Sequence, residues 1–352
     1  MQVQFNGGTV RDEDLIIPTL FSQPTAEQLA GLPTLGTITA NSPTIGRRSL
    51  VQYGFGANSA VTGFPNVGKS WYDGGSVSLT RRFSRNLGLT AAYTFSKTLD
   101  NSTNELNSSA LNPRRPQDGF NIDDEKGLSA LDVPHRFVTS FNYDLPFFNN
   151  NGNPFVRAFL GGWQVNGIFQ IQSGQPITIR SGIDSNRNLD AAGDRATFNP
   201  NGDPNISSGI QAVALINGVV TPVALGNAAT VAYVALNPNA GYVPTGFLAR
   251  SNLGRNTFRT RGYNETDMVI LKNTRFGTDG RFNFQIGAEI IDLFNQRPRT
   301  IGGTGAQVEA LFTGGVGAQS AAFGIAGNPN FLNYDIGTFT GRTVTLRAKF
   351  IF

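Results

Sequence analysis

The 352-residue chain contains no cysteine, one histidine, two methionines and two tryptophans. The absence of cysteine excludes disulfides, thiol catalysis and cysteine metal sites. No apolar run approaches the roughly eighteen residues of a membrane-spanning helix. The amino terminus, MQVQFNGGTVRDED, has neither the basic start nor the apolar core of a secretory signal. These absences do not exclude a membrane protein, because a closed β-barrel satisfies its backbone groups without any spanning helix.

Charge is also scarce. Asp, Glu, Lys and Arg make up 15% of the chain, against about a quarter in an average soluble protein. The net charge of +4 is spread along the sequence. A nucleic-acid-binding protein would concentrate Lys and Arg on one face, so we expect no nucleic-acid partner. The 42 glycines and 27 phenylalanines favour strands and loops over helices.

Two neighbouring stretches, 137–145 and 163–172, alternate between apolar and polar residues. Because strand side chains point to opposite faces with period two, each stretch predicts a strand with one apolar and one polar face. The polar faces carry amides and hydroxyls rather than the Lys and Glu typical of soluble sheets. Each stretch has about the 9–11 residues that a tilted strand needs to cross a bilayer. The pattern is typical of a barrel whose apolar face meets lipid and whose polar face lines the lumen.

The same alternation predicts further strands along the chain, with an extension of the second stretch at 175–181 and a possible strand end at 2–7. The other predicted strands lie at 76–83, 89–96, 265–276, 281–296 and 342–352. We therefore predict an all-β fold, an antiparallel transmembrane β-barrel that is partial, with about eight strands of a larger barrel.

The predicted connections alternate in length. Short ones fall at 84–87, 146–155 and 277–280. Long ones, rich in Gly, Asn, Pro and Ala, fall at 8–69, 101–132, 181–261 and 298–340. Outer-membrane barrels have short periplasmic turns and long extracellular loops, so we assign the long connections to the outside and the carboxyl terminus to the periplasm. Within the long connections we expect a short helix at 25–32 and a β-hairpin turning at Asn217-Gly218.

The last strand has five apolar side chains on one face and ends on an aromatic residue. In bacterial outer-membrane barrels such a strand is the segment that the insertion machinery recognises, and we predict this role for it. The residues concerned are Val344, Leu346, Ala348, Phe350 and Phe352.

Several segments together resemble the TonB-dependent outer-membrane receptors of the Oar-like type. They are WYDGGSVSLTRRFSRNLGLTAAYTFSKTLDN, LDVPHRFVTSFNYDLPF, LGGWQVNGIFQIQSGQPITI, SGIDSNRNLDAAGDR, MVILKNTRFGTDGRFNFQIGAEIIDLFNQ and the closing strand. The resemblance implies a barrel of about twenty-two strands with a plug inside it, energy coupling through a TonB-type partner that contacts the plug, and uptake of a bulky nutrient. On this interpretation residues 1–352 are the carboxyl-terminal segment of the barrel and contain no plug domain, and the partners are outer-membrane lipid, the insertion machinery and an unknown nutrient.

Two alternatives stay open. A small complete barrel of about eight strands would act as a pore or an adhesin. A secreted β-sandwich would bind carbohydrate through its aromatic residues and would remain in solution without detergent.

We expect no catalytic function and no resident cofactor. His135 is the only histidine, and no nucleophile-elbow motif accompanies it. The aromatic residues near the predicted strand ends suit either an interfacial girdle or an ordinary core. One loop places oxygen ligands at alternate positions, as calcium loops do, although it departs from the EF-hand pattern at Leu189 and Arg195. This calcium candidate consists of Asp184, Asn186, Asn188, Asp190 and Asp194.

Overall fold

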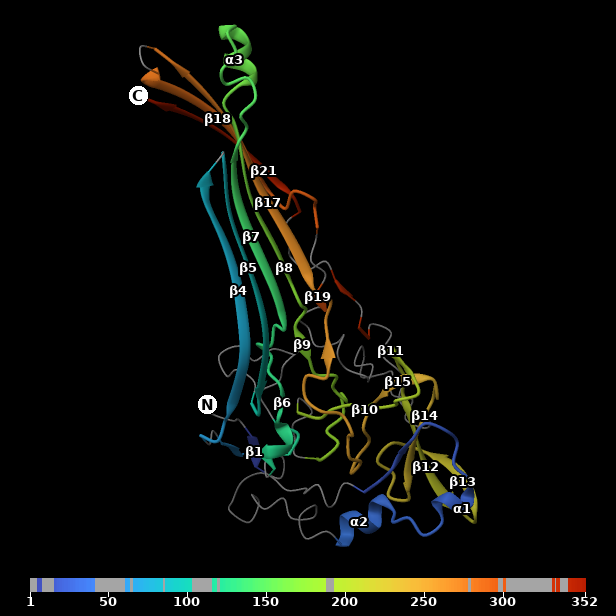
Figure 1. The fold of residues 1–352 in the computed structure, drawn as a ribbon. Helices are drawn as coiled ribbons and strands as arrows, with labels where there is room; N and C mark the ends of the chain where they lie inside the picture. Colours follow the sequence, from blue (N-terminus) through green and yellow to red (C-terminus); the bar gives the residue numbers. More distant parts are fainter. Residues whose placement is uncertain are drawn as a thin grey trace.

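The computed structural model describes residues 5–7, 16–41, 61–63, 66–84, 86–102, 116–118, 121–187, 193–277, 280–296, 300–301, 331–332, 334–335 and 341–352. Its main feature is an eight-stranded sheet that forms the elongated upper part of the molecule in Figure 1. Seven long strands follow the order β21-β18-β17-β8-β7-β5-β4, and the two-residue β6 pairs with β5. Every pairing within this sheet is antiparallel. The predicted all-β class is confirmed, and the barrel is not closed: within the described residues β4 and β21 each pair on one side.

The strand bounds agree with the predicted alternation. The sheet consists of β4 (Ser70–Ser84), β5 (Leu87–Asp100), β6 (Gly127–Leu128), β7 (His135–Asp144), β8 (Trp163–Gln172), β17 (Tyr263–Phe276), β18 (Phe282–Ile291) and β21 (Thr343–Ile351).

The register places most of the apolar side chains of the seven long strands on one face. Residues that pair across two strands share a face. Two rows across the sheet show this: Tyr93 pairs with Phe137 and Phe137 with Ile171 in one row, and Ala288 pairs with both Ile270 and Leu346 in another. We call this side the apolar face and the opposite side the polar face. The charged side chains on the apolar face include Arg81 and Lys272, toward the end of the sheet that carries α3 (Pro154–Leu160), and Asp73 and Lys97, which pair with each other toward the opposite end.

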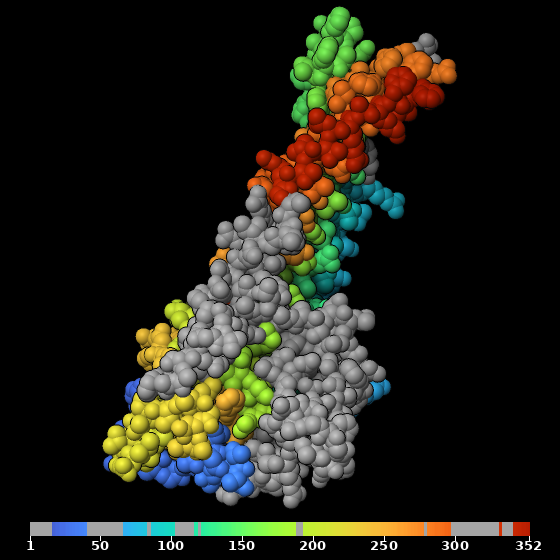
Figure 2. Space-filling view, turned by 180° about the vertical axis from the view of Figure 1, so that it is seen from behind, coloured from blue at the N-terminus to red at the C-terminus, as the bar shows by residue number. Residues whose placement is uncertain are grey.

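A second unit, which we call the loop body, lies at the opposite end of the sheet from α3 (Figure 1). It comprises residues 16–41, 176–187 and 193–259. Two helices, α1 (Ala26–Leu29) and α2 (Leu35–Asn41), lie close to strands β12 and β13 in both views (Figures 1 and 2). The strands are β2 (Thr19–Leu20), β9 (Pro176–Ile177), β10 (Thr197–Phe198), β11 (Asp203–Ser207), β12 (Ile210–Ile216), β13 (Val219–Val223), β14 (Ala232–Ala235), β15 (Ala240–Val243) and β16 (Phe258–Arg259).

The loop body has apolar cores of its own. β2 joins the edge of the β13-β12-β14 sheet in parallel, so a segment early in the chain packs on one two hundred residues later. Tyr233, Ile210 and Leu248 are completely buried there. Burial of side chains of this size stabilises a folded unit by roughly 1.5–3 kcal/mol each. The long connections are therefore ordered in their described parts.

The structure confirms two of three local predictions, the short helix and the β-hairpin, and contradicts the third, the strand extension. The helix near 25–32 is confirmed as α1, whose Thr25 and Gln28 form a capping box. The hairpin is confirmed as β12 and β13, with Asn217 and Gly218 at positive φ as a tight two-residue turn requires. The predicted extension at 175–181 is wrong as a continuation of β8, because β9 leaves the main sheet to pair with β16.

Two further differences concern local structure. The connection after β7 is longer than the predicted turn at 146–155, because α3 forms where Asn153 caps a helix that starts at Pro154. At the start of the chain, β1 (Phe5–Gly7) pairs with β3 (Val61–Gly63) in a sheet of its own rather than with the main sheet. The remaining pair is β19 (Thr300–Ile301) with β20 (Tyr334–Asp335). None of the helices in the described part of the chain has the length and apolar composition to cross a bilayer.

Candidate functional site

The polar face of the sheet is connected by hydrogen bonds between neighbouring strands. Gln170 of β8 donates to Glu265 of β17 at 2.6 Å. The side chains of Asn283 and Gln285 on β18 both donate to the side-chain oxygen Oδ1 of Asn273 on β17, at 3.1 and 3.0 Å. Amides and carboxylates therefore form a hydrophilic lining, as the wall of a watery lumen requires.

Where this lining meets the loop body, four charged side chains form what we call the buried ion-pair cluster: Asp100, Glu125, Arg195 and Arg255. Each side chain is at most 6% exposed. Arg255 pairs with Asp100 and Arg195 pairs with Glu125, while Arg255 Nε also lies 3.8 Å from Glu125 Oε2. Two guanidinium groups thus balance two carboxylates, and this pairing is what makes buried charge tolerable.

Backbone groups complete the cluster. Arg255 donates to the carbonyl oxygens of Glu125 at 3.1 Å and Asp100 at 2.5 Å. The planar guanidinium offers five donors, so one arginine can bond two segments at once. Asp100 ends β5, Glu125 lies in a 3-10 helix over Ile122–Glu125 (η4), and Arg195 and Arg255 belong to the loop body. The cluster therefore holds the loop body against the end of the sheet.

A second ion pair also joins the loop body to the sheet. Arg259 pairs with Asp132, which is almost fully buried. Asp132 also accepts the Thr98 amide at 2.6 Å, and the Arg259 side chain donates to the Gly174 carbonyl at 2.8 Å. Nearby, the Asn256 side chain donates to the Leu128 carbonyl at 2.6 Å. The end of β5, the 127–133 segment and the 255–259 segment are thus one bonded assembly.

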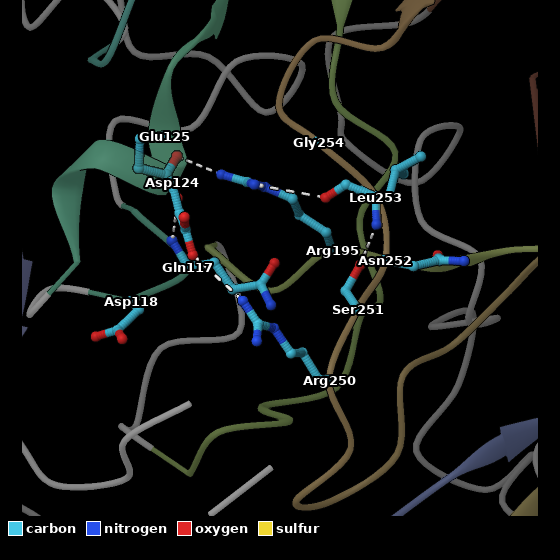
Figure 3. A pocket seen from close by; sticks show the side chains of 10 residues that line it. All are labelled: Gln117, Asp118, Asp124, Glu125, Arg195, Arg250, Ser251, Asn252, Leu253 and Gly254. Atoms are coloured by element: carbon cyan, nitrogen blue, oxygen red, sulfur yellow. Dashed lines mark hydrogen bonds and ion pairs between the residues drawn. The ribbon is translucent and has the colours of Figure 1, made fainter. Parts of the chain in front are cut away.

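A cavity of about 300 Å³ adjoins this assembly (Figure 3). Its wall is mostly polar, with the acids Asp118 and Asp124, the amides Gln117 and Asn252, and Arg250. Arg250 pairs with Asp124 at 3.3 Å, and both side chains are more than half exposed. In Figure 3, Arg195 reaches from Glu125 to the Leu253 backbone carbonyl, to which it donates at 3.5 Å. The cavity wall therefore presents charges of both signs, amides and the Ser251 hydroxyl.

The calcium candidate is described in part. Asn188 and Asp190 lie outside the described residues. Asn186 uses its amide to donate to the Gln117 carbonyl at 2.6 Å, the Asp184 carbonyl accepts the Arg187 amide at 3.4 Å, and Asp194 is 2% exposed. Among the described residues no group of three or more His, Cys, Asp or Glu side chains could hold a metal. Calcium binding stays a prediction.

The residues of the predicted insertion signal lie where the alternation placed them. Val344, Leu346, Ala348 and Phe350 pair with Ile290, Ala288, Ile286 and Phe284 on the apolar face. Phe350 also stacks with Phe282 and Phe352 at 5.9 and 6.2 Å. The strand therefore has the apolar, aromatic-ended face that recognition would need, and the recognition itself stays a prediction.

His135 lies on the apolar face near the loop body. Its Nδ1 is 2.8 Å from the Tyr93 hydroxyl, and the Phe95 ring is 5.3 Å away. This is an aromatic cluster at one end of the apolar face. Phe276, Phe282 and Phe350 form a second cluster at the other end. Two aromatic clusters that flank an apolar band are typical of the interfacial girdles of a membrane barrel.

Sequence reasoning did not single out the buried ion-pair cluster. Its members are up to 155 positions apart, and no local motif joins them. The available signal is weak: residues 250–261 carry four arginines and no acidic residue in a chain otherwise poor in charge.

Comparison with known proteins gives one family. Residues 12–319 match the family described as "Outer membrane beta barrel domain". No curated protein matches the chain. Among solved structures, the chain is similar to the outer membrane transporter YddB from Escherichia coli, with 10% identity and a TM-score of 0.29 over 83% of this chain and 26% of that one. The chain thus spans about a quarter of that structure's length. The matched residues cover most of the chain, and the two-faced antiparallel sheet agrees with the match, so the chain belongs to the outer membrane beta barrel domain family and lies in the bacterial outer membrane.

Proposed function

We propose that the chain supplies wall and ligand-capturing loops to a receptor for energy-coupled uptake of a bulky nutrient, of the TonB-dependent, Oar-like type. One observation supports this most: the loop body has its own cores and is fixed to the sheet by the buried ion-pair cluster. A binding surface that is ordered before the ligand arrives loses less conformational entropy on binding. A passive pore has no need of such a surface.

The proposal includes an orientation. The loop body faces the outside and α3 faces the periplasm, since outer-membrane barrels carry their long loops outside and their short turns within. The apolar face meets lipid, and the last strand is recognised by the insertion machinery. A plug contributed from outside these 352 residues would receive the energy-coupling partner.

The ligand would first meet polar groups. The exposed pair Arg250–Asp124 at the cavity offers one cation and one anion, and the neighbouring amides offer hydrogen bonds in both directions. The function is binding and passage, and we propose no catalytic step for any residue.

The test is nutrient uptake by the native bacterium with and without this gene. Cells are compared on limiting siderophore-bound iron, oligosaccharide or peptide, each with and without a proton ionophore. We expect deletion to abolish uptake of one class, and the ionophore to abolish the same uptake in the parent strain. Unchanged uptake of every class in the deleted strain would contradict the proposal. Leakage of small solutes through the purified protein in vesicles, independent of any gradient, would favour the pore.

A further inference from the structure

Helix α3 leaves a large apolar surface uncovered at the end of the sheet away from the loop body. Phe155, Phe159 and Leu160 are 74%, 71% and 51% exposed, and α3 has no buried residue. Phe147 and Phe148, in the turn that precedes the helix, are about half exposed. Contiguous apolar surface of this kind marks an interaction site.

The helix is amphipathic. At about 100° per residue, Phe155, Val156, Phe159 and Leu160 fall on one side, and Arg157 falls on the other. Asn153 caps the helix by accepting the Phe155 amide at 2.9 Å, so the first turn is fixed although the Phe155 side chain is exposed. This arrangement suits a boundary between an apolar and an aqueous phase.

Hydrogen bonds fix α3 to the sheet. The Gly162 carbonyl accepts the Asn273 amide at 2.8 Å, and the Gly162 amide donates to the Asn149 side chain at 2.6 Å. Asn149 in turn donates to the Leu145 carbonyl at 3.0 Å. A β-carbon on Gly162, which has φ +73°, would come within 2.2 Å of the Asn273 oxygen, so this close junction depends on glycine.

The chain passes from α3 to the apolar face within a short connection. The helix ends at Leu160, and Trp163, the first residue of β8, lies on the apolar face, where it pairs with Lys272. The Lys272 ammonium donates to the Asn273 carbonyl at 2.9 Å and to the Thr274 hydroxyl at 3.1 Å, and the residue is only 9% exposed. The Lys272 ammonium is therefore hydrogen-bonded to its own strand, β17, next to the place where Asn273 bonds to Gly162 after α3.

We propose that α3 lies in the plane of the membrane at its periplasmic boundary. Phe155, Phe159 and Leu160 insert among the acyl chains of the phospholipid leaflet, and Arg157 points to the headgroups. Aromatic side chains are favoured at this depth, and Arg reaches the headgroup phosphates. The proposal rests on the orientation given above, and it holds whether or not the protein imports a nutrient.

The test uses the absence of cysteine, since any introduced cysteine is the only one. Phe159→Cys carries a nitroxide on the apolar side of α3, and Arg157→Cys is the matched control on the opposite side. The full protein is reconstituted in vesicles of phosphatidylethanolamine and phosphatidylglycerol. Collision of the nitroxide with oxygen, which concentrates in lipid, is compared with collision with a water-soluble nickel complex.

We expect the label at 159 to collide mainly with oxygen and the label at 157 mainly with nickel. Nickel access at both positions would place α3 in the periplasm and overturn the proposal. Shielding of the label at 159 from both reagents would show a protein partner or a second copy and would also overturn it. If Phe159→Cys does not accumulate in membranes, Phe155→Cys gives the same comparison.

Discussion

Individual charged residues differ greatly in how much they contribute to the loop body. Arg255 is surrounded by two carboxylates and two backbone carbonyls, and its side chain is 3% exposed. Arg250, five positions earlier, pairs with one carboxylate in open solvent. Exposed pairs stabilise little because water screens them, whereas breaking a buried pair leaves a charge without compensation.

Replacing Arg255 with Met therefore provides a sharp comparison. Arg255→Met leaves Asp100 and Glu125 buried without their shared cation, and we expect the free energy of unfolding of the loop body to fall by about 3–5 kcal/mol. Arg250→Met is the control and should change it by less than about 1 kcal/mol. Native-state proteolysis of the protein in membranes measures both. Equal protease resistance of the two variants would show that the cluster does not hold the loop body.

Tyr233 makes the loop body sensitive to alkali. Burial raises the pKa of its hydroxyl above the ordinary value of 10.0, and the hydroxyl donates to the Phe247 carbonyl at 3.0 Å. As pH rises past 10, the unfolded chain loses a proton that the folded chain keeps, so stability falls with rising pH. Below that pH both states are protonated and the effect is absent.

Tyr233→Phe should lower stability at neutral pH by about 1 kcal/mol through the lost hydrogen bond. It should also flatten the decline above pH 10. Hydrogen exchange of the β12 and β14 amides across this range provides the measurement. A decline as steep in Tyr233→Phe as in the parent would assign the alkaline sensitivity to another group.

At the scale of elements, each long strand has one apolar and one polar face. Leu346 and Thr345 are neighbours in β21, yet Leu346 pairs with Ala288 on the apolar face and Thr345 with Glu289 on the polar face. This opposition is the physical cause of the period-two pattern, and it is why the sequence predicts the seven long strands closely. The pairing of other elements depends on residues far away in the sequence. β9 leaves the main sheet because it pairs with β16, and no local sequence pattern indicates this pairing.

Paired substitutions in β21 test the two faces. Leu346→Arg places a cation in lipid and should destabilise the protein by about 2–4 kcal/mol. Thr345→Arg faces the lumen beside Glu289 and should be nearly neutral. The fraction of protein that resists urea extraction from membranes reports the difference. Comparable loss for both variants would mean that β21 does not separate lipid from water.

At the scale of the whole molecule, the sheet has one apolar and one polar face, and the loop body lies at one end of it. The alternation predicts the apolar and polar faces because the pattern lies within the sequence of each strand. The loop body and the cavity depend on contacts such as Asp100 with Arg255 and Thr19 with Tyr233, which join residues far apart in the chain. Those segments are rich in Gly, Asn and Pro, which predict turns, and the helix and hairpin expected within them do not indicate that they pack into one unit.

The central claim is that the apolar face meets lipid and the polar face meets water. The most direct measurement introduces single cysteines along β7 of the otherwise cysteine-free chain and treats intact outer membranes with a membrane-impermeant maleimide. Val138, Ser140 and Asn142 lie on the polar face, and Thr139, Phe141 and Tyr143 lie on the apolar face. We predict labelling at the first three positions and protection at the last three. Equal labelling at all six positions, or labelling on the apolar face alone, would contradict the account.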